Sequence, residues 1–176
     1  MATSAAGLVS TTVSTDQLAP LGFELLEPAS SGADTNSGEG QKIWVYVQND
    51  AAAAAAWTAG KVIMRLAATS THQGVLAPVA IVAPMRMLGV AQHAIPSDSF
   101  GFILKRGIGV ITAGNGAALT VNTLVTTGGT VVLGTGLDAV ADASAITDTT
   151  SEAVGWCTVG AAAAANATCW IDCKGG

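Results

Sequence analysis

The hydrophobic residues of this 176-residue chain fall in short runs, separated by stretches rich in Gly, Pro, Asn, Asp and Ser. The clearest run spans 87–113, where a strand over 87–91 is followed by a Pro-containing turn over 95–99 and a second strand. Side chains of that second strand alternate between two faces, with Phe100, Phe102, Leu104 and Arg106 opposed to Gly101, Ile103 and Lys105. Gly107 and Gly109 then interrupt the apolar pattern, which predicts a bulge or bend rather than a helix.

Short strands with frequent turn signals are predicted along most of the remaining chain. They cover residues 22–27, 42–48, 61–67, 74–82, 119–126, 130–133, 154–159 and 168–173. Gly128 and Gly129 favour a hairpin between two of these strands, and the last two strands form another pair. One short helix is expected over 51–57, capped by residue 49 or 50 and ended by Gly60. About ten short strands with little helix predict an all-β barrel or sandwich.

The strand over 42–48 has apolar side chains on both of its faces, with Trp44 and Tyr46 on one and three β-branched residues on the other. This pattern predicts burial on two sides. One face would meet the core and the other a partner subunit, because Trp and Tyr bury a large area at the cost of few rotamers.

Residues 1–20 are rich in Ser, Thr and Ala, with Leu8, Val9 and Val13 as their main apolar positions. The segment is too polar to form a core element alone, and its β-branched residues favour an extended path. Such an arm either adds to a sheet edge of a neighbouring subunit or completes a sheet of its own chain. We therefore expect an extended N-terminal arm over 1–20 and a single β-rich domain over 21–176.

Charged residues are scarce. Hydrophobic residues make up 50% of the chain, whereas charged residues make up only 11%, against about 25% in ordinary soluble domains. A free monomer normally covers itself with charge, so this deficit favours a chain whose surface is hidden in an assembly. The alternative is a monomer whose exposed side chains are mostly small Ala, Gly and Thr.

The seven Lys and Arg residues are scattered: Lys42, Lys61, Arg65, Arg86, Lys105, Arg106 and Lys174. The formal net charge is −5. Such a distribution cannot form the cationic stripe that neutralises phosphates, so nucleic acid is not an expected partner.

Neither a membrane segment nor a secretory signal is predicted. The longest apolar run, 74–85, is interrupted by Pro78 and Pro84 and falls short of the roughly 20 residues that span a bilayer. The N-terminus has no basic region before an apolar core. We expect a soluble protein.

Three features suggest reaction or cofactor sites, and each has a simpler interpretation. Segment 134–139 matches the glycine pattern of dinucleotide-binding loops, but its flanks predict hairpins rather than a parallel βαβ unit. His93, Ser97 and Asp98 fall in one turn, whereas a catalytic triad is usually assembled from distant positions. His72 lies in a polar turn without ligand partners, where solvation is expected. We therefore expect neither enzymatic activity nor a bound cofactor.

Metal and disulfide sites are also not predicted. The polar loop 29–40 lacks the regular acidic spacing of a calcium loop. Cys169 and Cys173 would lie about 13 Å apart along one strand, beyond bridging distance. Cys157 could meet either of them across a hairpin, but three cysteines do not imply a disulfide framework. We expect buried, reduced thiols that act as small hydrophobes.

Two stretches carry a resemblance to a known group of proteins. Segment 87–113 runs through Gly-Val-Ala, Ile-Pro-Ser, Phe-Gly-Phe and Arg-Gly to a Val/Ile/Thr run, and segment 48–65 passes from Asn through an Ala-rich turn to Gly-Lys-Val. In this order the chain resembles the small head-decoration (cement) proteins and related accessory structural proteins of tailed bacteriophages.

The resemblance implies a structural virion subunit on the outer surface of the phage head. Such a subunit, made in the host cytoplasm, would bind the major capsid protein and other copies of itself, as a homotrimer at threefold-like positions. The residues that we expect to make assembly contacts are Leu8, Val9, Val13, Trp44 and Tyr46. The alternatives are a head-fibre or tail-associated subunit and, from another class, a β-sandwich carbohydrate-binding module that uses exposed tryptophans.

Overall fold

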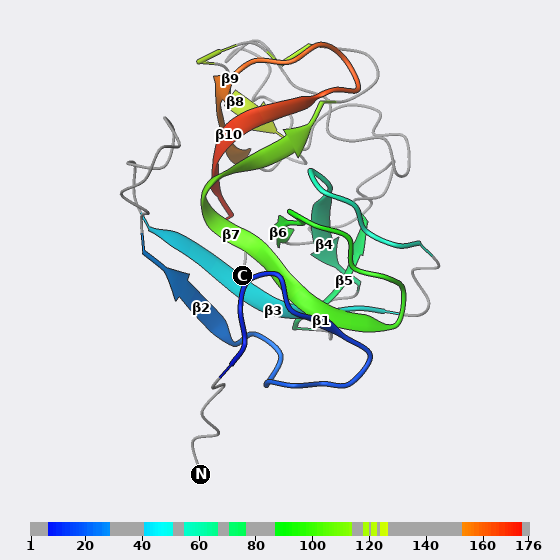
Figure 1. The fold of residues 1–176 in the computed structure, drawn as a ribbon. Helices are drawn as coiled ribbons and strands as arrows, with labels where there is room; N and C mark the ends of the chain where they lie inside the picture. Colours follow the sequence, from blue (N-terminus) through cyan, green and yellow to red (C-terminus); the bar gives the residue numbers. More distant parts are fainter. Residues whose placement is uncertain are drawn as a thin grey trace.

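The computed structural model describes residues 7–28, 41–50, 55–66, 71–76, 87–113, 118–119, 121–122, 124–126 and 153–173 (Figure 1). The strands are β1 Val13–Ser14, β2 Glu24–Glu27, β3 Lys42–Asn49, β4 Val62–Arg65, β5 Gln73–Leu76, β6 Met87–Val90, β7 Ser99–Thr112, β8 Leu124–Thr126, β9 Ala153–Val159 and β10 Asn166–Asp172. These residues contain no helix. The prediction of an all-β fold is confirmed.

Five of the strands close into a small barrel. Their hydrogen-bonded order is β3, β5, β4, β6 and β7, and β7 returns to pair with β3. The β3–β7 ladder is antiparallel and runs from the Ile43–Arg106 pair to the Asn49–Ser99 pair. The β3–β5 pair is parallel, whereas the other three pairs of the ring are antiparallel. Closure leaves these five strands without the open sheet edges that favour aggregation.

Strand β7 belongs to two parts of the sheet. Its first half pairs with β3 in the barrel, and its second half pairs with β10, from Arg106 opposite Asp172 to Thr112 opposite Asn166. Strands β9 and β8 continue the sheet beyond β10. Gly107 lies between the halves with a φ of 120°, a conformation that side chains rarely allow. The strand curves strongly in this region (Figure 1), so the predicted bend is confirmed.

One hydrophobic cluster packs on the barrel strands and combines aliphatic side chains with one tryptophan. The cluster consists of Val45, Val47, Trp57, Ile63, Leu88, Ala91, Ile95 and Ile103. Trp57 and Ile95 exchange backbone hydrogen bonds of 2.9 and 3.1 Å. The buried Asn49 side chain donates hydrogen bonds of 3.0 Å to the carbonyl groups of Ala55 and Ile95. These bonds tie three separate chain segments together next to this cluster.

The helix predicted over 51–57 is wrong for its described part. Residues 55–57 are not helical, and Trp57 forms an isolated β-bridge instead. Asn49 donates through its amide nitrogen to carbonyl groups, whereas a helix cap would accept from backbone N–H groups. Residues 51–54 lie outside the described residues.

A second hydrophobic cluster is formed by the opposite faces of the same strands and by β9 and β10. It includes Trp44 and Tyr46 of β3, Phe102 and Leu104 of β7, and the cysteines and aliphatic residues of β9 and β10. Successive residues of β3 and β7 therefore belong to different clusters, as the predicted alternation of side chains between two faces requires. Burial of β3 on two sides is confirmed, and both sides are covered by this chain.

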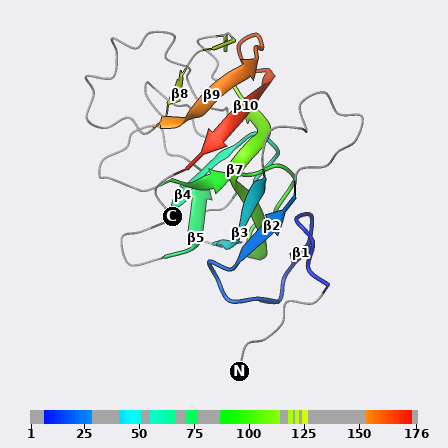
Figure 2. The ribbon, with the colours of Figure 1, turned by 90° about the vertical axis from the view of Figure 1, so that its left-hand side faces the viewer.

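The N-terminal segment wraps around the end of the molecule that carries β2 and β3 (Figure 2). Val13 and Ser14 pair with Gly101 and Phe100 of β7. The backbone N–H of Leu18 donates a 3.1 Å hydrogen bond to the Tyr46 hydroxyl oxygen. Of the two alternatives for the arm, its described part therefore completes a sheet of its own chain.

The other predicted strands differ mainly at their ends. Within the predicted 119–126, β8 covers Leu124–Thr126, residues 121 and 122 form a turn, and Leu119 forms an isolated bridge with Ala161. The last two strands pair antiparallel as predicted. Residues 77–82, the strand over 130–133 and the turn at Gly128 and Gly129 lie outside the described residues.

Candidate interaction surfaces

The turn with His93, Ser97 and Asp98 does not form a nucleophilic triad. The Ser99 hydroxyl donates a 3.4 Å hydrogen bond to the Ser97 carbonyl group, and Asp98 has a positive φ of 55°. Nε2 of His93 has no hydrogen-bond partner among the described residues. Burial lowers the pKa of His93. These features belong to a tight turn that leads into β7.

The other features that the sequence analysis considered are the glycine-containing segment 134–139, the polar loop 29–40 and the three cysteines. Segment 134–139 and the loop 29–40 lie outside the described residues. Among the described residues, no group of three or more His, Cys, Asp or Glu could hold a metal ion. Cys157, Cys169 and Cys173 are all buried, as expected from the sequence.

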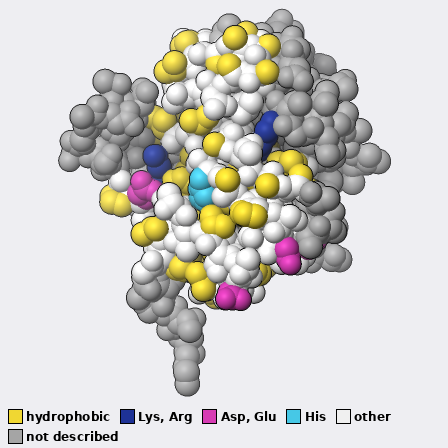
Figure 3. Space-filling model, turned by 45° about the vertical axis from the view of Figure 1, so that its right-hand side comes forward, with side chains coloured by type: hydrophobic (Ala, Val, Ile, Leu, Met, Phe, Trp, Pro, Cys, Tyr) yellow, Lys and Arg dark blue, Asp and Glu magenta, His cyan; other side chains and the backbone are white. Residues whose placement is uncertain are grey.

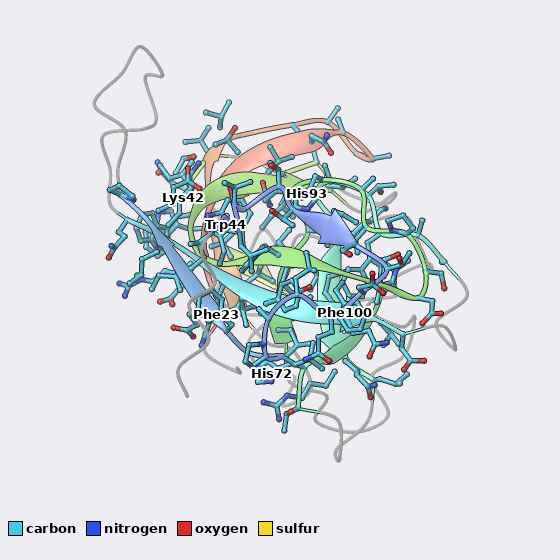
Figure 4. All side chains as sticks on the ribbon, turned by 60° about the horizontal axis from the view of Figure 1, so that its bottom comes forward. Phe23, Lys42, Trp44, His72, His93 and Phe100 are labelled. Carbon is cyan, nitrogen blue, oxygen red and sulfur yellow. The ribbon has the colours of Figure 1, made fainter. Side chains whose placement is uncertain are left out.

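His72 is less solvated than the sequence suggested. It is half-buried, and its imidazole ring lies against Gly22. The side chain of His72 is labelled in Figure 4. Burial lowers the pKa of His72, Arg65 and Lys105 lower it further, and Glu24 opposes them. Lys105 and Glu24 form an ion pair of 2.8 Å. The environment of His72 therefore favours the neutral ring at pH 7.

Two of the five expected assembly contacts lie inside the fold. Trp44 and Tyr46 are 6% and 0% exposed, so their side chains offer almost no surface to a partner. The Trp44 indole donates a 2.8 Å hydrogen bond to a Glu27 carboxylate oxygen, and the Tyr46 ring packs 5.0 Å from the Phe102 ring. This part of the prediction is wrong, because β2 and the N-terminal segment cover the face that we assigned to a partner.

The other expected contacts lie nearer the surface. Leu8 is half-buried against the second cluster, whereas Val9 and Val13 are 57% and 37% exposed. Leu18 and Leu26, which the sequence did not single out, are 50% and 56% exposed. We call Val9, Val13, Leu18 and Leu26 the N-terminal apolar surface. The segments that carry them lie at the β1–β2 end of the molecule (Figure 1).

A pair of tryptophans forms a second surface feature. Trp156 of β9 lies directly opposite Trp170 of β10, and the two indole rings stack with centroids 5.7 Å apart and planes inclined by 21°. Trp156 is 47% exposed. Their neighbours Cys157 and Cys169 are buried, so the tryptophans occupy the opposite face of the sheet. We call these two residues the tryptophan pair.

Sequence reasoning missed the tryptophan pair because it treated both residues as parts of apolar strands. Adjacent residues of a strand point to opposite faces, so only one residue of each adjacent Trp–Cys pair can face the core. This signal was present at Trp156 and Cys157, and again at Cys169 and Trp170. The cross-strand register that stacks the two rings depends on the fold.

Few charges separate the apolar groups on the molecular surface. In the view of Figure 3, hydrophobic side chains are spread over the described face, and charged ones are few. The ion pair between Lys105 and Glu24 is itself partly exposed on this surface. The low charge of the sequence therefore carries through to the folded surface.

No protein-family model matches the chain, and no significant match was found among curated proteins or solved structures. The described residues also include no helix that is long and apolar enough to cross a membrane.

Proposed function

We propose that this chain is a structural subunit of a phage virion that decorates and reinforces the outer surface of the head. The observation that carries the proposal is the combination of large exposed apolar side chains with a charged fraction of only 11%. Such a surface is poorly suited to a solitary soluble domain and well suited to one that is covered by other subunits. No catalytic group is needed for this function.

The N-terminal segment is held in a way that supports assembly. Pairing with β7 and the hydrogen bond to Tyr46 fix the backbone that carries Val13 and Leu18. A surface that is already ordered loses less conformational entropy when it binds. We propose that the N-terminal apolar surface joins copies of this chain into a homotrimer.

The tryptophan pair supports a second contact. Strands β9 and β10 lie at the opposite end of the molecule from β1 and β2 (Figure 1). A subunit with one contact at each end can bridge two neighbours, and several weak contacts in one trimer add up to firm attachment. In the proposed arrangement, the tryptophan pair faces the major capsid protein and the N-terminal apolar surface faces the other copies.

Charge substitution tests this arrangement. Val9→Asp combined with Leu18→Asp should dissociate the trimer, because each new carboxylate would be desolvated in the interface. Thr11→Asp combined with Thr15→Asp is the matched control, since both threonines are exposed in the same segment and the charge change is equal. Sedimentation velocity measures the mass, and co-sedimentation with phage heads lacking this chain measures attachment. A wild-type monomer that does not bind heads would refute the proposal.

A carbohydrate-binding module is the second candidate function, and the exposed tryptophan pair is the observation that favours it. Flat aromatic rings can pack against the apolar face of a sugar. The Thr158 hydroxyl, which donates a 3.0 Å hydrogen bond to the Thr168 carbonyl group, lies on the same strand as Trp156 and can accept a hydrogen bond from a sugar hydroxyl. Glycan-array binding that is lost in Trp156→Ala and kept in Val159→Ala would support this function. Val159 is a suitable control because it is similarly exposed on the same strand.

A further inference from the structure

Two of the three cysteines face each other across a strand pair. Cys157 of β9 lies directly opposite Cys169 of β10 in antiparallel register. Both side chains are fully buried, and they lie on the same face of the sheet because directly opposite residues share a face. The sequence left the partner of Cys157 open, whereas the fold selects Cys169.

The backbone separation suits a covalent bond. Residues directly opposite in an antiparallel pair have Cα atoms roughly 4.5–5.5 Å apart, and disulfides in proteins span about 4.4–6.8 Å between Cα atoms. Cys173 follows Cys169 by four residues, just past the end of β10, so it lies about 13 Å farther along the chain. The geometry therefore permits one specific pairing and excludes the Cys169–Cys173 pairing.

We propose that Cys157 and Cys169 are an oxidation site, at which the chain forms an intramolecular disulfide when a small disulfide compound such as oxidised glutathione is present. One cysteine sulfur attacks the compound and releases one thiol. The other cysteine sulfur then attacks the mixed disulfide and releases the second thiol. Both cysteines are oxidised, the compound is reduced to two thiols, and the two protons from the cysteines end on those thiols.

Burial determines when this reaction proceeds. It raises the pKa of the Cys157 thiol, and it raises the pKa of the Cys169 thiol to about 12. The reactive thiolate is therefore scarce in the folded chain, and exchange is expected during folding or when β9 separates from β10. Once formed, the bond is shielded from reductants by the same burial.

The disulfide would fasten β9 to β10 beside the tryptophan pair, since Trp156 and Trp170 adjoin the two cysteines. The closed loop contains the turn between the two strands. Closing a loop of this size restricts the unfolded chain and raises the melting temperature. This inference depends on the chain's own geometry, so it stands or fails independently of the proposed capsid function.

Refolding the full chain from denaturant in a buffer of reduced and oxidised glutathione tests the proposal. Free thiols are alkylated, elastase cleaves within the alanine run 161–165, and chymotrypsin cleaves after Trp170 to separate Cys169 from Cys173. Mass spectrometry should find a Cys157–Cys169 cross-link and an alkylated Cys173. The melting temperature should lie roughly 5–10 °C above that of the reduced chain.

Variants separate this pairing from other possibilities. Cys173→Ser should still form the cross-link, and oxidation should raise its melting temperature by the same amount as in the wild-type chain. Because this variant keeps both paired cysteines, it tests the proposal even where changes at Cys157 or Cys169 impair folding. Cys157→Ala and Cys169→Ala should lose both effects. A cross-link that includes Cys173, or three alkylated thiols in the refolded wild-type chain, would overturn the proposal.

Discussion

Replacement of Gly155 by alanine is predicted to weaken the β9–β10 pair severely. A Cβ atom at this position would overlap the carbonyl oxygen of Trp170, and it would lie 2.8 Å from the Trp170 carbonyl carbon and 3.1 Å from the Cα atom of Ile171. All three are backbone atoms of β10. Because β10 also pairs with β7 along its other edge, these atoms cannot move without disturbing a second ladder.

The size of the effect follows from two contributions. Overpacking of a filled site costs about 1–3 kcal/mol. The φ of 154° at Gly155 adds strain of about 1 kcal/mol for a residue with a side chain. The sum, about 2–4 kcal/mol, is a large fraction of the 5–15 kcal/mol by which typical domains are stable.

Urea unfolding followed by fluorescence measures the free energy of unfolding. Gly7→Ala is the control, because Gly7 also has a positive φ, of 98°, but has nothing within 4 Å of the added Cβ. We expect the control to lose only about 1 kcal/mol from backbone strain. Far-ultraviolet circular dichroism should also lose the exciton signal of the stacked tryptophans in Gly155→Ala alone. Equal losses of stability in the two variants would refute the predicted clash.

Three further predictions concern side chains of the described residues. Tyr46→Phe removes the acceptor of the Leu18 N–H and should lower the free energy of unfolding by about 1 kcal/mol in urea titrations. Glu24→Gln breaks the partly exposed ion pair with Lys105 and should cost at most about 0.5 kcal/mol, with the difference vanishing in high salt. Burial lowers the pKa of His93, so the unfolded chain binds a proton more readily than the folded chain. The contribution of His93 to stability is therefore present above about pH 6.5 and is lost as the pH falls through the lowered pKa of the folded chain. On acidification, the urea midpoint should fall less in His93→Gln than in the wild-type chain.

The local pattern predicted several elements because their causes are local. Alternation at Phe102, Ile103 and Leu104 placed neighbouring side chains of β7 on opposite faces, and the structure puts them in the two different clusters. The glycine at 107 predicted a bend, which its positive φ confirms. The apolar faces of β3 predicted burial on two sides. Each of these properties depends on the residue itself and its near neighbours.

The arrangement in space could not be predicted in the same way. Barrel closure requires β3 to pair with β5 and β7, which lie far along the chain, and no residue type specifies that pairing. Trp44 and Tyr46 were assigned to a partner because the covering segment, residues 7–28, was not recognised as their neighbour. The Cys157–Cys169 and Trp156–Trp170 pairs likewise depend on the cross-strand register.

Image reconstruction of intact phage particles that carry this chain tests the proposed function most directly. We predict density for the β3–β7 barrel on the outer surface of the head, with three copies in contact through Val9, Val13, Leu18 and Leu26 and the tryptophan pair against the shell. Density for this fold at the tail alone, or heads that contain no copy of the chain, would contradict the account.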